Sequence, residues 1–181
     1  GGKLLIAMPG MGDPRFERSV VFMCAHSDDG AMGLIVNRPA RDIGFDDLLE
    51  QLGIPTVHPH RSIHVHFGGP VEHGRGFVLH SADYETAEGT LEVDENFGMT
   101  ATLDILREIS TGGGPRSCIL ALGYSGWGPG QLEAEIQANG WLTCDATPEI
   151  VFGTDNDHKW EAALQSIGIN PSLLSSTGGS A

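Results

Sequence analysis

Short apolar runs separated by turn residues constrain the fold of this chain more than any other feature. Residues 4–8 are continuously apolar and stop at Pro9, as expected for a strand buried on both faces. Residues 19–26 and 31–37 are rich in β-forming side chains. Their connection ends in Asp29-Gly30, which supplies the positive φ angles of a tight hairpin. Further strands are predicted at residues 63–67, 77–80 and 117–122, with a weaker one at 91–93.

Four segments have the apolar periodicity of amphipathic helices. In the first, Phe45, Leu48, Leu49 and Leu52 recur at helical spacing. The second begins near Thr102, the third covers residues 131–139 and the fourth covers residues 160–167. The second helix precedes the strand at 117–122, which is typical of a βαβ-like unit. No repeat or linker divides the sequence, so we expect one domain over residues 1–181, with a frayed Ser/Gly-rich tail at 172–181.

Charge and cysteine content limit the partners and the compartment. Ten Lys and Arg against 24 Asp and Glu give a net charge of −14, so DNA and anionic membranes would be repelled. The three cysteines, Cys24, Cys118 and Cys144, form no C-x-x-C pair and are expected to be reduced thiols of a cytoplasmic protein. A chain of this size buries about 70% of its unfolded surface, so no metal or cofactor is expected to be needed.

Three longer segments carry a family resemblance. They read MPGMGDPRFERSVV at residues 8–21, HSDDGAMGLIVNRP at 26–39 and LGYSGWGPGQLE at 122–133. Shorter matches at residues 68–71, 76–80 and 141–142 extend it over nearly the whole chain in the same order. On these motifs the chain resembles the bacterial AlgH family, also called YqgE.

The resemblance implies a mixed α/β fold, in which a bifurcated sheet curls into a pseudo-barrel, here with about four flanking helices. The family is labelled as one of transcriptional regulators, and no catalytic residues are established for it. The acidic charge and the lack of a recognisable DNA-reading helix make direct DNA binding the least favoured function.

Ser125 and Glu135 are the candidates for catalysis. Gly123-Tyr124-Ser125-Gly126 follows a predicted strand and resembles the start of the G-x-S-x-G turn of acyl hydrolases, but Trp127 occupies the fifth position. The alternative is a structural loop. Glu135 lies on the border of the buried face of the third helix, where it could act as a general base. Its alternative role is to cap a loop N–H or to pair with Arg18 or Arg38.

Arginines in the motif loops suggest a site for an anion. If the fold gathers the loops that carry Arg15, Arg18, Arg38 and Arg75, they would form a positive pocket, aided by the N-terminus of the third helix. The alternative is that each arginine pairs with a surface carboxylate. The predicted ligand-binding residues lie in loops between strong strands: Asp13, Arg18, Asn37, Arg38, Gly68, Gly69, Arg75, Tyr124 and Trp127. Trp127 is otherwise expected to anchor the core.

Two histidines could ligate a metal. His64 and His66 alternate with apolar residues and should project from one face of a strand. Two ligands are not enough, and His58, His60, His73 or His80 would have to complete the site. The alternative is a set of partly exposed histidines without a metal.

The favoured function is a noncatalytic regulatory protein that binds a protein partner or a small molecule, for which an anion is one candidate. The rival is an enzyme, either a hydrolase that uses Ser125 or a metal enzyme that uses His64 and His66. The oligomeric state and the identity of the ligand are left open.

Overall fold

A computed structural model describes residues 2–9, 12–55, 63–84 and 89–174. The strands are β1 (Lys3–Ala7), β2 (Val20–Ser27), β3 (Gly30–Ile35), β4 (Val65–Phe67), β5 (Val71–Ser81), β6 (Thr90–Glu92), β7 (Phe97–Thr100), β8 (Cys118–Trp127) and β9 (Trp141–Asp145). The helices are α1 (Phe45–Gln51), α2 (Leu103–Ser110), α3 (Gln131–Gln137), α4 (Pro148–Phe152) and α5 (Lys159–Ser166), with short 3-10 turns η1 (Pro14–Phe16), η2 (Asn156–His158) and η3 (Pro171–Leu173).

All nine strands join one sheet, in the order β6-β7-β5-β8-β3-β2-β1-β9, with β4 paired to β8 off this path. The predicted hairpin is present as β2 and β3, paired from Ser27↔Gly30 to Val21↔Ile35. The predicted βαβ-like unit is also present as β7, α2 and β8. Strands β7 and β8 lie on either side of β5 and both run antiparallel to it, so they are parallel to each other. The result is the mixed α/β domain with a curled, bifurcated sheet that the sequence suggested.

The sheet divides at Gly123 of β8. Before this glycine, residues 120–122 pair in parallel with β4; after it, residues 125–127 pair antiparallel with β3. Gly123 has a φ of +76°, and a Cβ there would lie 2.6 Å from the Gly69 carbonyl oxygen. Gly123 acts as one extra residue in β8, and it shifts by one position the alternation of side chains between the two faces of the sheet. Ala121 and Tyr124 therefore both face the interior of the curled sheet.

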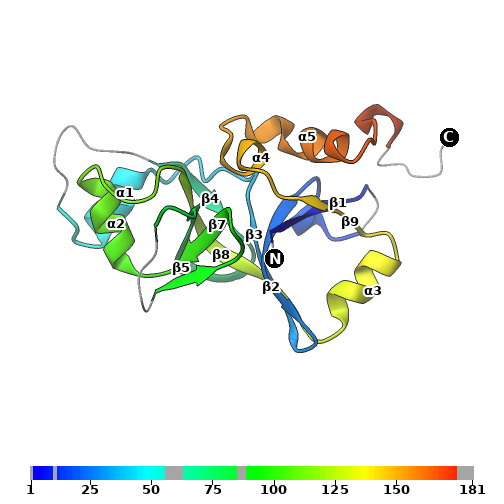
Figure 1. Cartoon of the computed structure of the whole chain (residues 1–181), viewed down its shortest axis with the longest axis horizontal. Coiled ribbons are helices and arrows are strands. Elements are labelled where there is room, and N and C mark those ends of the chain that lie inside the picture. The colour runs from blue at the N-terminus through cyan, green and yellow to red at the C-terminus, as the bar shows by residue number, and fades with distance from the viewer. Residues whose placement is uncertain (1, 10–11, 56–62, 85–88, 175–181) are drawn as a thin grey trace.

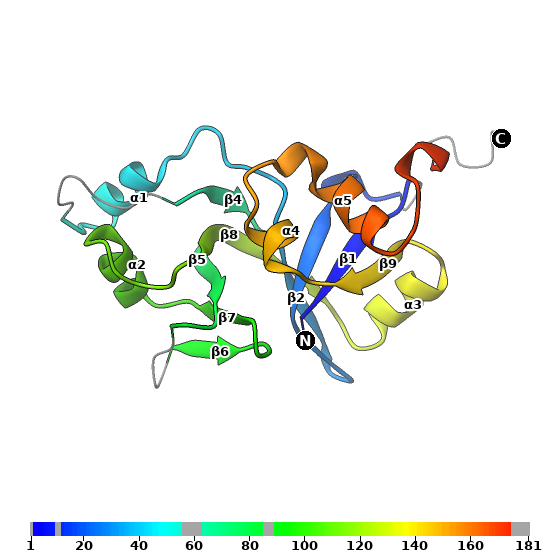
Figure 2. The ribbon, with the colours of Figure 1, turned by 45° about the horizontal axis from the view of Figure 1, so that its top comes forward.

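Helices cover most of the sheet (Figures 1 and 2). Helices α1 and α2 pack against the outer face of β5 and β8, around Leu49, Ile105 and Leu120. Helix α3 covers the outer face of β1, β2 and β3 through Leu132. Helices α4 and α5 close one end of the concave interior with Val151 and Trp160, whose neighbours include Phe22 and Leu34. The described residues therefore form five α-helices where four were predicted; α4, only five residues long, is too short for periodicity to reveal.

Two further predictions need correction. Residues 123–127, expected to form a loop, continue strand β8, because β3 and the start of β5 supply backbone partners there. Strands β7 and β9 were not predicted; β7 is buried on both faces and shows no alternation. None of the helices in the described part of the chain is long and apolar enough to cross a membrane.

Candidate functional site

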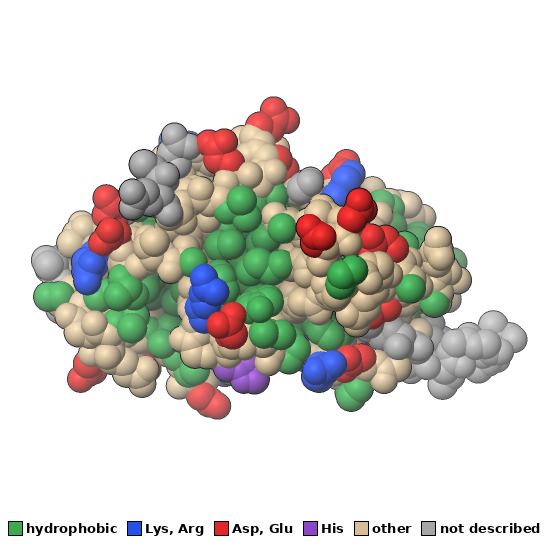
Figure 3. Space-filling model, turned by 90° about the horizontal axis from the view of Figure 1, so that it is seen from below, with side chains coloured by type: hydrophobic (Ala, Val, Ile, Leu, Met, Phe, Trp, Pro, Cys, Tyr) green, Lys and Arg blue, Asp and Glu red, His purple; other side chains and the backbone are tan. Residues whose placement is uncertain are grey.

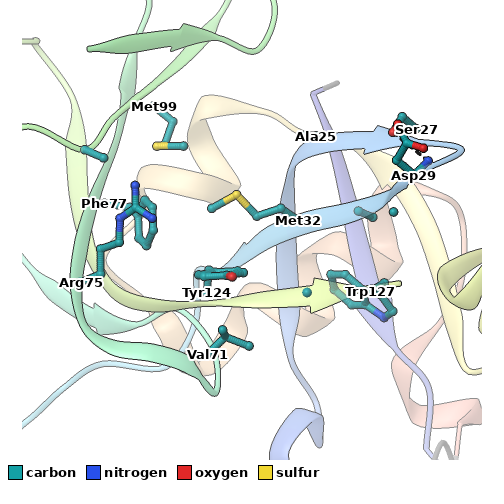
Figure 4. Close-up of a pocket in the computed structure, with 14 residues that line it drawn as sticks. Ala25, Ser27, Asp29, Met32, Val71, Arg75, Phe77, Met99, Tyr124 and Trp127 are labelled. Carbon is teal, nitrogen blue, oxygen red and sulfur yellow. Dashed lines mark hydrogen bonds between the residues drawn. The ribbon is translucent and has the colours of Figure 1, made fainter. Parts of the chain in front are cut away.

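The open end of the concave interior forms a groove of about 690 Å³ between the β2–β3 hairpin and β5. It lies on the face opposite α4 and α5, where apolar side chains gather in a central hollow (Figure 3). Figure 4 shows Arg75 and Phe77 of β5 facing Met32 of β3 across Tyr124 of β8. Trp127 and the hairpin residue Asp29 stand at the far end. We call this cavity the groove.

The wall of the groove on β5 contains a wide bulge. Val71 pairs with Tyr124 and Gly76 with Leu122, so five steps along β5 match two along β8. The looped-out residues are exposed, and Glu72 has a φ of +50°, which is strained for a side chain other than glycine. Bulges of this kind change the direction of the side chains they carry, and they are common beside functional sites. Here the bulge brings Arg75 back over the ring of Phe77, 5.0 Å from its centroid.

Arg75 is the one arginine or lysine that lines the groove in the described structure. Its guanidinium lies 3.6 Å from the Glu72 carboxylate, and both side chains are about half exposed. An exposed pair of this length is weak, and Arg75 could therefore exchange Glu72 for a ligand carboxylate at little cost.

A second cavity, of about 670 Å³, lies beyond Trp127 between η1, the 69–71 segment and α3. We call it the Glu135 pocket. The Oε1 atom of Glu135 accepts the indole N–H of Trp127 at 3.1 Å and that of Trp141 at 2.9 Å. The Gln131 amide donates to Oε2 at 3.0 Å. Glu135 thus binds neither Arg18 nor Arg38, contrary to the sequence-based alternative, because α3 packs beside the two tryptophans.

At the closed end of the interior lies a polar cluster of the buried Lys159 and His66 with the partly buried Asn156. The Lys159 ammonium donates to the carbonyls of Val36 and Val151, and burial lowers the pKa of Lys159 to about 8. His66 Nε2 lies 3.3 Å from the Asn156 side-chain oxygen. Burial, then the nearby Lys159 charge, lowers the pKa of His66 to about 4. Both side chains are too deeply buried to meet a substrate.

Ser125 is not a nucleophile at an exposed turn. It lies within β8 with no exposed surface and donates its hydroxyl to the Gly68 carbonyl at 3.2 Å. Gly68 and Gly69 press against the backbone of β8, where a Cβ on Gly69 would lie 2.2 Å from the Tyr124 carbonyl. These glycines therefore hold the branch of the sheet together. The premise of the hydrolase interpretation, a strand-to-helix turn that exposes Ser125, is not met, because the segment is a strand.

The other predicted binding residues do not converge on one cavity. Asp13 lines the Glu135 pocket and pairs with Arg15. Asn37 bridges two strands, accepting from Val20 N–H and donating to the Arg18 carbonyl. Arg18 stacks 4.2 Å above Trp160 and pairs with Glu161, so it packs against α5 and not beside Arg75.

Arg38 donates to the Glu17 carbonyl, at the end of β3 remote from α3. At the start of α3, the Gly128 N–H is taken by the Gln131 side chain at 3.0 Å. The predicted gathering of the loop arginines at this helix therefore does not form. The antiparallel register of β3 and β8 places Arg38 and the helix at opposite ends of β3.

The predicted metal ligands are also separated. His64 is exposed and His66 faces Asn156 in the interior. No three His, Cys, Asp or Glu side chains come together as a metal site within the described ranges. His58 and His60 lie outside the described residues.

Comparison with known proteins agrees with this architecture. A family model described as AlgH-like matches residues 4–172. The chain belongs to the AlgH-like family. A UPF0301 protein of Ruegeria pomeroyi is 62% identical over 181 residues, covering 99% of this chain and 98% of that protein. A UPF0301 protein of Cereibacter sphaeroides is 59% identical over 180 residues, with the same coverage of both chains.

Two solved structures share the fold. The solution structure of the AlgH protein from Pseudomonas aeruginosa is 42% identical, with a TM-score of 0.80 over 95% of this chain and 90% of that one. A crystal structure of a Corynebacterium diphtheriae protein, 20% identical, has a TM-score of 0.68 over 91% of this chain and 85% of its own. At that identity the second likeness concerns the fold alone.

Sequence reasoning found Arg75, Tyr124 and Trp127 but missed the rest of the groove. Met32 and Phe77 fall in predicted strands with no site role, and Met99 lies in β7, which the sequence does not predict. Alternation could have placed Met32 on the same face as Leu34, yet it could not show that this face opens to solvent. The missing information was which end of the sheet interior α4 and α5 cover.

Proposed function

We propose that this family member is a noncatalytic binding protein whose partner is a protein segment that places apolar side chains in the groove. The observation that carries the proposal is the composition of the groove, which combines Trp127, Tyr124, Phe77, Met32 and Arg75. Aromatic residues, methionine and arginine are the types enriched at the centres of protein interfaces. Methionine side chains also adapt their shape to a partner.

The chemistry of the groove favours binding over catalysis. A hydroxyl or thiol nucleophile needs a base within hydrogen-bond distance. The Ser27 hydroxyl accepts the Asp29 backbone N–H at 3.2 Å. Of the hydroxyls that line the groove in the described structure, none is hydrogen-bonded to a histidine or a carboxylate.

A small anionic ligand is the second candidate, and Arg75 is the observation that favours it. The groove volume lies within the range of about 300–1,000 Å³ usual for small-molecule sites. A ligand of this kind would place its carboxylate at Arg75 and an apolar body against Phe77. The open shape and the methionine at the centre make a protein segment the better fit.

Site-directed photo-crosslinking in cells tests the proposal. A benzophenone amino acid replaces Met32, and in the control it replaces Leu103, which is exposed on α2 away from the groove. We expect one discrete protein adduct from position 32 and none of that mass from position 103. The purified partner should then bind the unmodified chain, and Tyr124→Ala should weaken binding at least tenfold, about 1.4 kcal/mol.

Three outcomes would contradict a protein partner. The same adducts could form from both positions, the adduct could be a second copy of this chain, or no adduct could form. Thermal stabilisation by a small carboxylate that is lost in Arg75→Ala would instead establish the anionic ligand.

A further inference from the structure

The Glu135 pocket holds a carboxylate that is fixed in place without a cation. Two indole N–H groups share its Oε1, and the Gln131 amide occupies one acceptor position of Oε2. Within the described residues, no lysine, arginine or histidine lies within 4.0 Å of it. An ionised carboxylate has about four acceptor positions, so Oε2 can accept another donor from the pocket.

The walls of the pocket suit the alkyl part of a cation. Phe16 and Trp127 stack with their ring centroids 6.3 Å apart, and Trp141 meets Phe16 edge-on at 5.6 Å. Phe16, Trp127, Pro9 and Pro70 all line the cavity. Aromatic rings attract cations as well as apolar chains.

The remaining charges leave Glu135 unbalanced. Arg15 also lines the pocket, but its Nε lies 3.0 Å from Asp13 Oδ1 and its Nη2 lies 2.8 Å from Oδ2. This two-point pair cancels its own charge. The surplus in the pocket is thus one negative charge, on a protein whose net charge is −14.

We propose that the Glu135 pocket binds a primary ammonium group, carried by a small alkylamine or by a lysine side chain. The ammonium donates to Glu135 Oε2, and its alkyl chain lies along Phe16 and Trp127. Asn139, which also lines the pocket, offers an amide oxygen to a second ammonium proton. A metal ion is a poorer fit because Arg15 already occupies the Asp13 carboxylate.

Titration with butylammonium, followed by tryptophan fluorescence, tests this proposal. Trp127 and Trp141 both donate to Glu135, so a bound ammonium should change their emission. We expect saturation at low millimolar concentration and at least tenfold weaker binding in Glu135→Gln. The matched control is Glu133→Gln, which removes the same charge from the same helix at an exposed position beside His26 and should bind as the parent does.

Asp13→Asn is a second test that leaves Glu135 intact. It releases the Arg15 guanidinium, whose positive charge would then oppose the ligand, so weaker binding is expected. Parallel titration with N-acetyl-lysine amide distinguishes the sources: tighter binding than butylammonium indicates a protein lysine, and weaker binding a free amine.

Two results would overturn the proposal. One is a fluorescence titration that fails to saturate up to about 10 mM with both butylammonium and N-acetyl-lysine amide. The other is equal weakening in Glu133→Gln and Glu135→Gln, which would mean diffuse attraction to an acidic surface. The two cavities share Val71, Gly126 and Trp127, but Met32 lines only the groove, so Met32→Ser should leave ammonium binding unchanged.

Discussion

The two ends of the curled sheet interior differ in how the chain completes them. At the closed end, Trp160 of α5 is buried and donates its indole N–H to the Ala7 carbonyl at 2.8 Å. Lys159 ties the end of β3 to α4 through the Val36 and Val151 carbonyls. At the open end, Met32 and Tyr124 continue the same apolar cluster but remain partly exposed.

The comparison separates residues that hold the fold from residues available for recognition. Lys159 and Trp160 at the closed end donate to backbone carbonyls, and removing them would leave these buried carbonyls without donors. Met32 and Tyr124 at the open end stay partly exposed, with no covering element in the described chain, and this exposure favours a partner. Substitutions at the closed end should therefore lower stability, whereas substitutions at the open end should weaken partner binding with little loss of stability.

The largest contrast is expected between Trp160→Ala and Met32→Ala. Trp160→Ala removes a buried ring and its hydrogen bond, and should lower the free energy of unfolding by about 3–5 kcal/mol. Met32→Ala, at a partly exposed position, should cost less than about 1 kcal/mol. Urea denaturation followed by far-UV circular dichroism measures both. Similar losses for the two variants would mean that the groove is part of the structural core.

Acid should destabilise the closed end through His66. Its folded pKa of about 4 lies below the ordinary value of 6.5, so the unfolded chain takes up the proton first as the pH falls. Stability that is present above pH 6.5 is therefore lost as the pH falls toward 4. The difference between the two pKa values corresponds to a loss of roughly 3 kcal/mol in the free energy of unfolding once His66 is fully protonated. Protonated His66 would place a proton on Nδ1, which has no partner in the described structure.

Unfolding measured between pH 7 and pH 4 checks this dependence. His66→Gln should reduce the slope, leaving the part due to His80, whose pKa burial also lowers. His26→Gln, at an exposed position on the hairpin, is the matched control. An unchanged slope in His66→Gln would show that His66 does not drive the acid sensitivity.

Ser125→Ala, at the branch between the two ends, should destabilise the fold less than Trp160→Ala or the protonation of His66. It removes one hydrogen bond to the Gly68 carbonyl and should cost about 1 kcal/mol without affecting binding in the groove. Partner affinity and urea stability are measured on the same preparation. A variant that retains its stability but loses a measurable hydrolytic activity would restore a catalytic role for Ser125.

Local patterns in the sequence determined the elements and much of their arrangement. The Asp29-Gly30 turn predicted the β2–β3 hairpin, and the spacing of Phe45, Leu48 and Leu49 predicted α1, because both depend on neighbours in the chain. The motif resemblance indicated the bifurcated sheet. It could not indicate that Gly123 is the branch point, since the change of partner from β4 to β3 involves strands far apart in sequence.

Only the tertiary structure decided where the sites lie. The sequence identified Arg18, Arg38 and Arg75 as loop cations, but strand register and the packing of α5 place Arg18 over Trp160 and leave Arg75 at the groove. The sequence likewise marked Glu135 as a border residue, while the fold made it the acceptor of two indoles from β8 and β9. Residue types and local periods fix what each segment can form. Which side chains meet depends on contacts between distant segments, and those contacts exist only once the sheet has curled and its helices have closed one end.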